Sequence, residues 1–137
     1  NPYDVYQSNI HLYNKTIKSQ FLQEFTDLEI KERVLYCYEK TLKKYIQDRN
    51  EIPKENHIEI SYDELSNEPL KSINKIYSHL KIGDFKQVEP NIIEYLSTVK
   101  NYKKNKFNTL SDQEISEINS RWGFSFKEWS YPINKLN

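Results

Sequence analysis

The sequence predicts an α/β fold, in which amphipathic helices cover a mostly parallel sheet. Residues 29–48 carry apolar side chains at helical spacing, and a second helical pattern occupies residues 67–80. Between them, residues 57–62 (His-Ile-Glu-Ile-Ser-Tyr) alternate with the period of two that is typical of a half-buried strand. A strand between amphipathic helices indicates a layered α/β protein, so we expect a helix-rich chain with one clear strand.

The first two helices are predicted from their caps and their apolar spacing. Asn1 is a favourable N-cap and Pro2 a favourable first helical residue, so the first helix is predicted from Pro2 to about Lys18. The second helix is predicted over residues 29–48, and Pro53 ends that region. Its apolar stripe consists of Ile30, Val34, Cys37, Tyr38, Leu42, Tyr45 and Ile46.

The predicted strand at residues 57–62 has no obvious partner in the rest of the sequence. A single strand cannot satisfy the hydrogen-bonding groups of its own backbone. The partner strands must therefore come from outside this pattern or from another copy of the chain. This requirement predicts that part of the fold lies upstream of Asn1.

The later elements are predicted from turn and cap residues. A helix is expected to open at Asn67 and to stop near Gly83, and a shorter helix is expected over residues 92–99. Ser111 and Glu114 have the spacing of a capping box, which starts the last helix. An aromatic tail, expected to pack back on the body, contains Phe124, Phe126, Trp129 and Tyr131.

The composition limits the functions that the chain could have. Twenty basic and twenty acidic residues cancel, which argues against a general electrostatic attraction to nucleic acid or to an anionic membrane, although a local basic site remains compatible. The only glycines, Gly83 and Gly123, lie too far apart for a glycine-rich phosphate loop. Cys37 is the sole cysteine, so no intramolecular disulfide forms, which favours the cytoplasm over a Golgi-type lumen. No segment approaches the ~20 apolar residues of a membrane span.

The segment from Asn1 to Ser8 is the first candidate for a binding role. The start of a helix presents unpaired backbone N–H groups and a partial positive charge, which together attract anions. Ser8 lies two turns into the predicted helix, where its hydroxyl can donate a hydrogen bond. Alternatively, Ser8 is only a small residue on a packed helix.

Two further segments could contact a nucleotide. Tyr62 ends the predicted strand, where an aromatic ring can meet a base in an α/β crevice; alternatively, its ring fills the core. Residues 100–107, which we call the lysine-rich segment, contain four lysines and two aromatic residues. This segment could neutralise a phosphate, or it could be an ordinary solvated loop.

Taken in order, the three segments resemble parts of the sulfotransferase family, in particular its bacterial-type branch. Asn1 to Ser8 is similar to the family's Asn-Pro-x-Asp-Val run and the serine that follows it. Tyr62 to Leu65 is similar to a Tyr-Glu-Asp-Leu motif, with the two acidic residues exchanged. Residues 104–107 are similar to the Lys-Asn-x-Phe portion of the family's C-terminal cofactor loop, although an Arg-Lys-Gly triplet upstream of that loop is missing.

The resemblance implies a fold, a reaction and a set of binding residues. It implies a three-layer fold like that of P-loop NTPases, with residues 1–137 forming the C-terminal portion of a single sulfotransferase domain. It implies transfer of a sulfuryl group from 3′-phosphoadenosine-5′-phosphosulfate (PAPS) to a hydroxyl or amine of a small-molecule or glycan acceptor, leaving adenosine 3′,5′-bisphosphate (PAP). The implied donor-binding residues are Ser8, Tyr62, Lys100, Lys103, Lys104 and Asn105.

The resemblance also implies which parts of the machinery are not in this sequence. The family's 3′-phosphate arginine would fall one place before Asn1, and its 5′-phosphosulfate loop and catalytic base lie further upstream. We therefore predict no catalytic residue and no metal site within residues 1–137, and no turnover by this chain alone. Two alternatives stay open: a non-enzymatic helical interaction module, and a fragment of another P-loop phosphotransferase.

Overall fold

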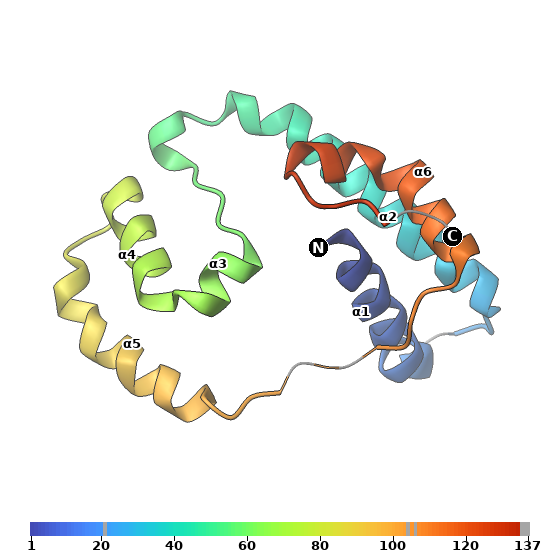
Figure 1. The fold of residues 1–137 in the computed structure, drawn as a ribbon, viewed down its shortest axis with the longest axis horizontal. Helices are drawn as coiled ribbons and strands as arrows, with labels where there is room; N and C mark the ends of the chain where they lie inside the picture. Colours follow the sequence, from blue (N-terminus) through green and yellow to red (C-terminus); the bar gives the residue numbers. More distant parts are fainter. Residues whose placement is uncertain (21, 104, 106, 135–137) are drawn as a thin grey trace. The chain divides into compact units, whose positions relative to one another are not determined.

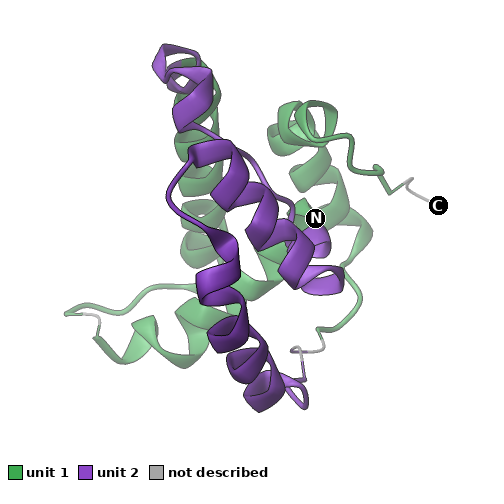
Figure 2. Cartoon of the chain, turned by 90° about the vertical axis from the view of Figure 1, so that its left-hand side faces the viewer, with its two compact units in different colours: residues 1–47, 106–137 green, residues 48–105 purple. Residues whose placement is uncertain are grey.

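The computed structural model describes residues 1–20, 22–103, 105 and 107–134, and these residues form two compact helical units (Figure 1). Unit 1 comprises residues 1–47 and 106–137, and unit 2 comprises residues 48–105 (Figure 2). None of the helices within the described ranges is both long and apolar enough to cross a membrane. The elements are α1 (Pro2–Lys15), η1 (Ile17–Gln20), α2 (Asp27–Asp48), η2 (Arg49–Glu51), η3 (Lys54–Asn56), α3 (Tyr62–Asn67), α4 (Pro69–Leu80), α5 (Phe85–Val99) and α6 (Asp112–Glu128).

The predicted α/β fold is wrong, because the described residues contain no β-strand and therefore neither a sheet nor a three-layer arrangement. The backbone is extended at His57 (φ −139°, ψ 129°) and at Ser61 (φ −71°, ψ 151°), as the alternating sequence predicts. Extended dihedral angles make a strand only when a neighbouring strand supplies hydrogen bonds. Here Ser61 instead caps α3, since its Oγ accepts a hydrogen bond from the backbone N–H of Glu64 at 3.0 Å.

The predicted first helix is confirmed in its start and is shorter than expected. Asn1 is the N-cap, and its Oδ1 accepts a hydrogen bond from the N–H of Tyr3 at 3.1 Å. The helix ends at Lys15, and the 3₁₀ turn η1 follows it. No glycine marks this end, which is why the apolar pattern alone placed it three residues too late.

α2 begins two residues before the predicted position, at a cap that spacing alone did not locate. The carboxylate of Glu29 accepts hydrogen bonds from Thr26 N (2.8 Å) and Thr26 Oγ1 (2.7 Å). The backbone N–H of Glu29 in turn donates to Thr26 Oγ1 at 3.2 Å. The backbone and side-chain hydrogen bonds from Thr26 lower the pKa of Glu29, because they stabilise its charged form.

The capping box predicted at the last helix is confirmed. The N–H of Glu114 donates to Ser111 Oγ at 3.3 Å, and Ser111 N donates to the Glu114 carboxylate at 3.0 Å. The helix extends to Glu128, so Phe124 and Phe126 belong to α6 and not to a separate aromatic tail.

The core of unit 1 is built around Trp122, which is fully buried where side chains of α1, α2 and α6 meet. Its indole N–H donates to the carbonyl of Leu35 at 3.1 Å. Tyr38 stacks on the indole at 3.7 Å between ring centroids, and Tyr6 meets its edge at 5.9 Å. The other buried members of this core are Tyr3, Val34, Leu35, Ile118 and Phe126.

A hydrogen-bonded triad ties the C-terminal residues to this core. The Tyr3 hydroxyl contacts Asn119 Oδ1 and accepts a hydrogen bond from Asn134 N at 2.9 Å. The side-chain amide of Asn119 donates to the carbonyl of Asn134 at 3.1 Å. The end of the described chain is therefore fixed to α1 and α6 by polar contacts.

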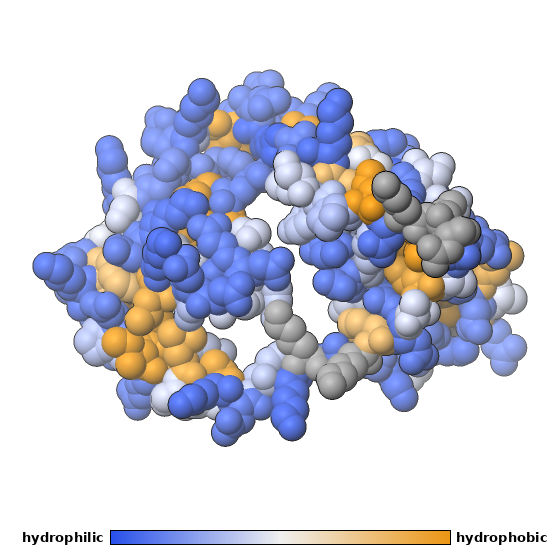
Figure 3. Space-filling model, in the orientation of Figure 1, coloured by the Kyte–Doolittle hydropathy of each residue, from blue (hydrophilic) through white to orange (hydrophobic). Residues whose placement is uncertain are grey.

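Unit 2 has a different internal organisation, because only the small polar residue Ser72 is buried among its described residues. Its hydroxyl donates to the carbonyl of Glu64 at 3.1 Å, which joins α4 to α3. Tyr77 of α4 meets Phe85 of α5 edge to face at 5.8 Å. Apolar side chains gather on the exposed surface over α5 (Figure 3).

Two boundary predictions in unit 2 are wrong. α4 ends at Leu80, where Lys81 adopts the left-handed conformation (φ 53°), while Gly83 (φ 136°) lies further along the turn. α5 begins at Phe85 and continues through Pro90, so it is not the short helix expected over residues 92–99. Proline removes one backbone donor from a helix, and the intact flanking turns tolerate that loss.

Exchanging two core tyrosines for phenylalanine should have opposite effects on stability. The Tyr6 hydroxyl is buried without a hydrogen-bond partner in the described part of the chain, so Tyr6→Phe should leave the free energy of unfolding unchanged or raise it slightly. Tyr3→Phe loses the contacts with Asn119 and Asn134 and should lower the free energy of unfolding by about 1 kcal/mol. Urea denaturation of both variants tests this, and equal losses would contradict the assignment.

Tyr6 should also make stability fall at alkaline pH. Burial, together with the nearby carboxylates of Glu114 and Glu117, raises the pKa of Tyr6 from 10.0 to about 12. The unfolded chain therefore loses this proton at lower pH than the folded chain, so stability is full below pH 10 and declines up to pH 12. At pH 11 the contribution of Tyr6 to the free energy of unfolding should be about 1.4 kcal/mol lower than below pH 10. Between pH 8 and pH 11 the free energy of unfolding of Tyr6→Phe should therefore fall less than that of the wild-type protein. Urea denaturation midpoints at the two pH values measure this.

Candidate functional site

Ser8 is exposed on α1, and residues near it in sequence contact the end of the lysine-rich segment and the residue after it. The side-chain amide of Gln7 donates to the carbonyl of Asn108. One turn further along, the ring of His11 meets the ring of Phe107 edge to face, with 6.0 Å between centroids. These contacts hold residues 107–108 against the part of α1 that carries Ser8.

The predicted lysines lie just before this anchored pair of residues along the chain. Lys100 is the C-cap of α5, and Lys103 and Asn105 follow it with exposed side chains. Neither Lys100 nor Lys103 forms an ion pair with any described residue. Lys104 lies outside the described residues. Lys100 and Lys103 thus carry positive charge that no carboxylate among the described residues pairs with.

Tyr62 has a different local setting from the one predicted. It is the first residue of α3 and not the last residue of a strand, and its side chain is 57% exposed. Its ring is therefore accessible to a ligand, which the alternative of a core-filling tyrosine did not allow. Ser8 belongs to unit 1, whereas Tyr62, Lys100, Lys103 and Asn105 belong to unit 2, so the predicted site is divided between the two units.

The histidines of unit 2 line a small cavity of about 390 Å³. A ring nitrogen of His79 lies 2.7 Å from the carbonyl oxygen of Lys54, which joins α4 to η3. In the same cavity Arg49 forms an ion pair with Glu59 at 2.7 Å.

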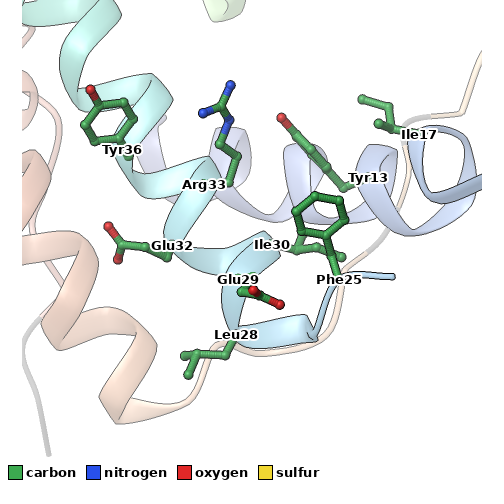
Figure 4. A pocket seen from close by; sticks show the side chains of 9 residues that line it. All are labelled: Tyr13, Ile17, Phe25, Leu28, Glu29, Ile30, Glu32, Arg33 and Tyr36. Atoms are coloured by element: carbon green, nitrogen blue, oxygen red, sulfur yellow. The ribbon is translucent and has the colours of Figure 1, made fainter. Parts of the chain in front are cut away.

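Sequence reasoning missed a pocket in unit 1. This cavity, of about 900 Å³, lies between the end of α1, η1 and the first turns of α2 (Figure 4). The sequence signals were a set of apolar residues in the connection before α2 and an arginine on the polar side of that helix. The lining residues are Tyr13, Ile17, Phe25, Leu28, Glu29, Ile30, Glu32, Arg33 and Tyr36.

Comparison with known proteins gives matches that cover Ser8 and Tyr62. A family model described as "Sulfotransferase family" matches residues 1–86. Two curated proteins, from Mycobacterium bovis and Mycobacterium tuberculosis, are each 27% identical to the chain over 130 residues. Both are named omega-hydroxy-beta-dihydromenaquinone-9 sulfotransferase Stf3.

The matches cover 95% of this chain and 33% of each mycobacterial protein, so the chain spans about a third of the length of these relatives. No solved structure gives a significant match. The lysine-rich segment lies beyond the residues that the family model matches. Because that model covers more than half of the residues, the chain belongs to the sulfotransferase family.

Proposed function

We propose that this chain forms the adenosine and 3′-phosphate side of the donor site in a sulfotransferase that uses PAPS. Ser8 would bind the 3′-phosphate and Tyr62 would lie against the adenine. Lysines of the lysine-rich segment would neutralise the phosphate charge, with Asn105 beside them. Residues 1–137 would then be the C-terminal portion of one sulfotransferase domain. The base and the groups that bind the 5′-phosphosulfate are assigned to no residue of this chain.

The observation that carries this proposal is the attachment of residues 107–108 to the part of α1 that carries Ser8. Gln7 and His11 contact Asn108 and Phe107, and Ser8 lies between them in sequence with its side chain exposed. Phe107 is the last residue of the lysine-rich segment. These contacts, which lie within unit 1, support a role for Ser8 near the end of that segment.

The chemistry of the reaction explains why such a site is useful. Transfer of a sulfuryl group leaves PAP, which carries phosphate charge at both its 3′ and 5′ positions. Hydrogen bonds from a hydroxyl and from ammonium groups to a phosphate are charge-assisted, which makes them stronger than bonds between neutral groups. Fixing the 3′-phosphate would orient the donor, and correct orientation is a large part of the rate enhancement in group transfer.

The names of the relatives support a proposal for the acceptor class. Both mycobacterial proteins are named for an omega-hydroxylated menaquinone derivative, an apolar molecule with a hydroxyl group. We extend that class to this chain and propose that its acceptor is a hydroxyl on a largely apolar small molecule. A glycan acceptor, which the family resemblance also allowed, is less consistent with these names.

Ser8→Ala should weaken PAP binding about tenfold, because it removes one hydrogen bond to a charged phosphate. AMP lacks the 3′-phosphate, so its affinity should not change. Isothermal titration of the full-length protein with each nucleotide measures both effects. Ser116→Ala, the same change at an exposed position of α6, is the matched control. If PAP binds both variants with the wild-type affinity, Ser8 is not part of the donor site.

The lysine-rich segment should contribute through charge. Lys100→Gln and Lys103→Gln should each weaken PAP, and the loss should be larger at low salt than at high salt because screening weakens Coulomb attraction. Lys86→Gln, an exposed position near the start of α5, is the control. If both segment variants retain wild-type affinity at low salt, these two lysines do not bind the nucleotide.

A further inference from the structure

The pocket of unit 1 contains a positive charge that lacks a counter-ion among the described residues. Arg33 lines the pocket and is exposed, and none of these residues pairs with it. Two acidic side chains also line the pocket: Glu29 stays charged and accepts two hydrogen bonds from the neutral Thr26, at 2.8 and 2.7 Å. Both oxygens of Glu32 accept hydrogen bonds from Arg121, at 2.8 and 2.6 Å. The guanidinium of Arg33 is therefore available to a ligand.

The rest of the pocket is mostly apolar or aromatic. Ile30 is only 2% exposed and forms part of the pocket wall, while Phe25 lies beside it in Figure 4. Leu28, in contrast, is 75% exposed, so an apolar side chain remains uncovered at the pocket. The volume of about 900 Å³ lies within the range of ~300–1,000 Å³ that is usual for small-molecule sites.

Two phenol groups add polar character near the charge. In Figure 4 the guanidinium of Arg33 lies between Tyr13 and Tyr36, and the hydroxyls of both rings point to the same side as the guanidinium. The carboxylate of Glu32 points the other way in that view. An arginine can give two parallel hydrogen bonds to a sulfate or a carboxylate, and neighbouring hydroxyls can add further donors.

We propose that this pocket binds a small anionic amphiphile, with a sulfate or carboxylate head on Arg33 and an apolar body over Phe25 and Leu28. The unpaired guanidinium of Arg33 favours an anionic head group, although the charged Glu29 also lines the pocket, and the apolar lining favours an amphiphile over an inorganic ion. A sulfate ester of an apolar alcohol has this chemistry, as does a fatty acid. Only the choice of the sulfate ester rests on the proposed function; the pocket and its ligand class do not.

The test uses four probes with the same eight-carbon chain. The full-length protein is titrated with octyl sulfate, octanoate, octanol and octyltrimethylammonium below their aggregation concentrations, and binding is followed by calorimetry. The two anions should bind at least tenfold more tightly than octanol, and the cation should bind most weakly. Tighter binding of octyl sulfate indicates the sulfate ester as the ligand, and tighter binding of octanoate indicates a fatty acid.

Two variants separate the contribution of the head group from that of the chain. Arg33→Gln should reduce the affinity for both anions about tenfold and leave octanol unchanged. Leu28→Gln should weaken all probes alike, because it adds polarity where the chain lies. Lys43→Gln removes a positive charge from the same helix outside the pocket, and the affinities for all four probes should stay at their wild-type values. Arg33 and Leu28 are exposed, so these changes leave the core of unit 1 intact.

Equal binding of anions and octanol by the wild-type protein would overturn the proposal. So would a loss of anion affinity in Lys43→Gln as large as that in Arg33→Gln, since the effect would then reflect net charge and not a site. PAP is titrated in parallel with each variant. If the wild-type protein does not bind PAP, the proposed donor site is wrong. The alkyl probes would still show whether the pocket binds an anionic amphiphile.

Discussion

The burial of Trp122 is the constraint on which the rest of unit 1 depends. Its ring touches aromatic residues of two other helices, and its indole N–H donates to a backbone carbonyl of α2. Aromatic side chains bury large surfaces and dominate the energy of small cores. In a chain with only 36% hydrophobic residues, one fully buried tryptophan surrounded by tyrosines supplies much of the available apolar contact. The hydroxyls of two of these tyrosines have partners, Ser125 for Tyr38 and Asn119 for Tyr3, whereas the buried hydroxyl of Tyr6 has none among the described residues.

This core also explains how α1 can pack firmly on one side and still present Ser8 for its proposed role. Tyr3 and Tyr6 are buried, and Ile10 and Tyr13 pack partly against the core, which is the spacing of one helix face. Ser8 lies outside that face and is exposed. The helix is therefore held firmly on one side while its other side stays accessible. A binding hydroxyl on a packed helix is placed more precisely than one on a loop, since its backbone cannot shift without disturbing Trp122.

Several elements were predictable from the sequence because the signal is local. The caps at Asn1 and Ser111 are side-chain-to-backbone interactions within three residues, and both occur as predicted. Thr26 and Glu29 have the same three-residue spacing, so this cap was also accessible to sequence reasoning. The prediction of a strand at residues 57–62 was wrong for a different reason. Alternation fixes the backbone dihedral angles, but a strand also requires a partner at long range, which no local pattern specifies.

The candidate site stays a prediction, and the structure shows only its local setting. The resemblance to the family selected Ser8 and Tyr62, and both side chains are exposed, which is compatible with binding. The contacts of Gln7 and His11 were not predictable, because their partners at residues 107–108 lie about a hundred positions away. The place of Arg33 in a pocket was equally unpredictable, since a basic residue on the polar side of an amphipathic helix is ordinarily solvated.

The distribution of ion pairs shows why a neutral composition can conceal local positive charge. Arg121 engages Glu32 and Glu39, and Lys31 pairs with Glu114, so three carboxylates of unit 1 are used in joining α2 to α6. Every carboxylate used in this way is unavailable to a neighbouring cation. Arg33 is left uncompensated beside Glu32 for that reason, although the chain as a whole carries no net charge. The net charge therefore describes long-range attraction, whereas binding at a single pocket depends on which charges the fold has already paired.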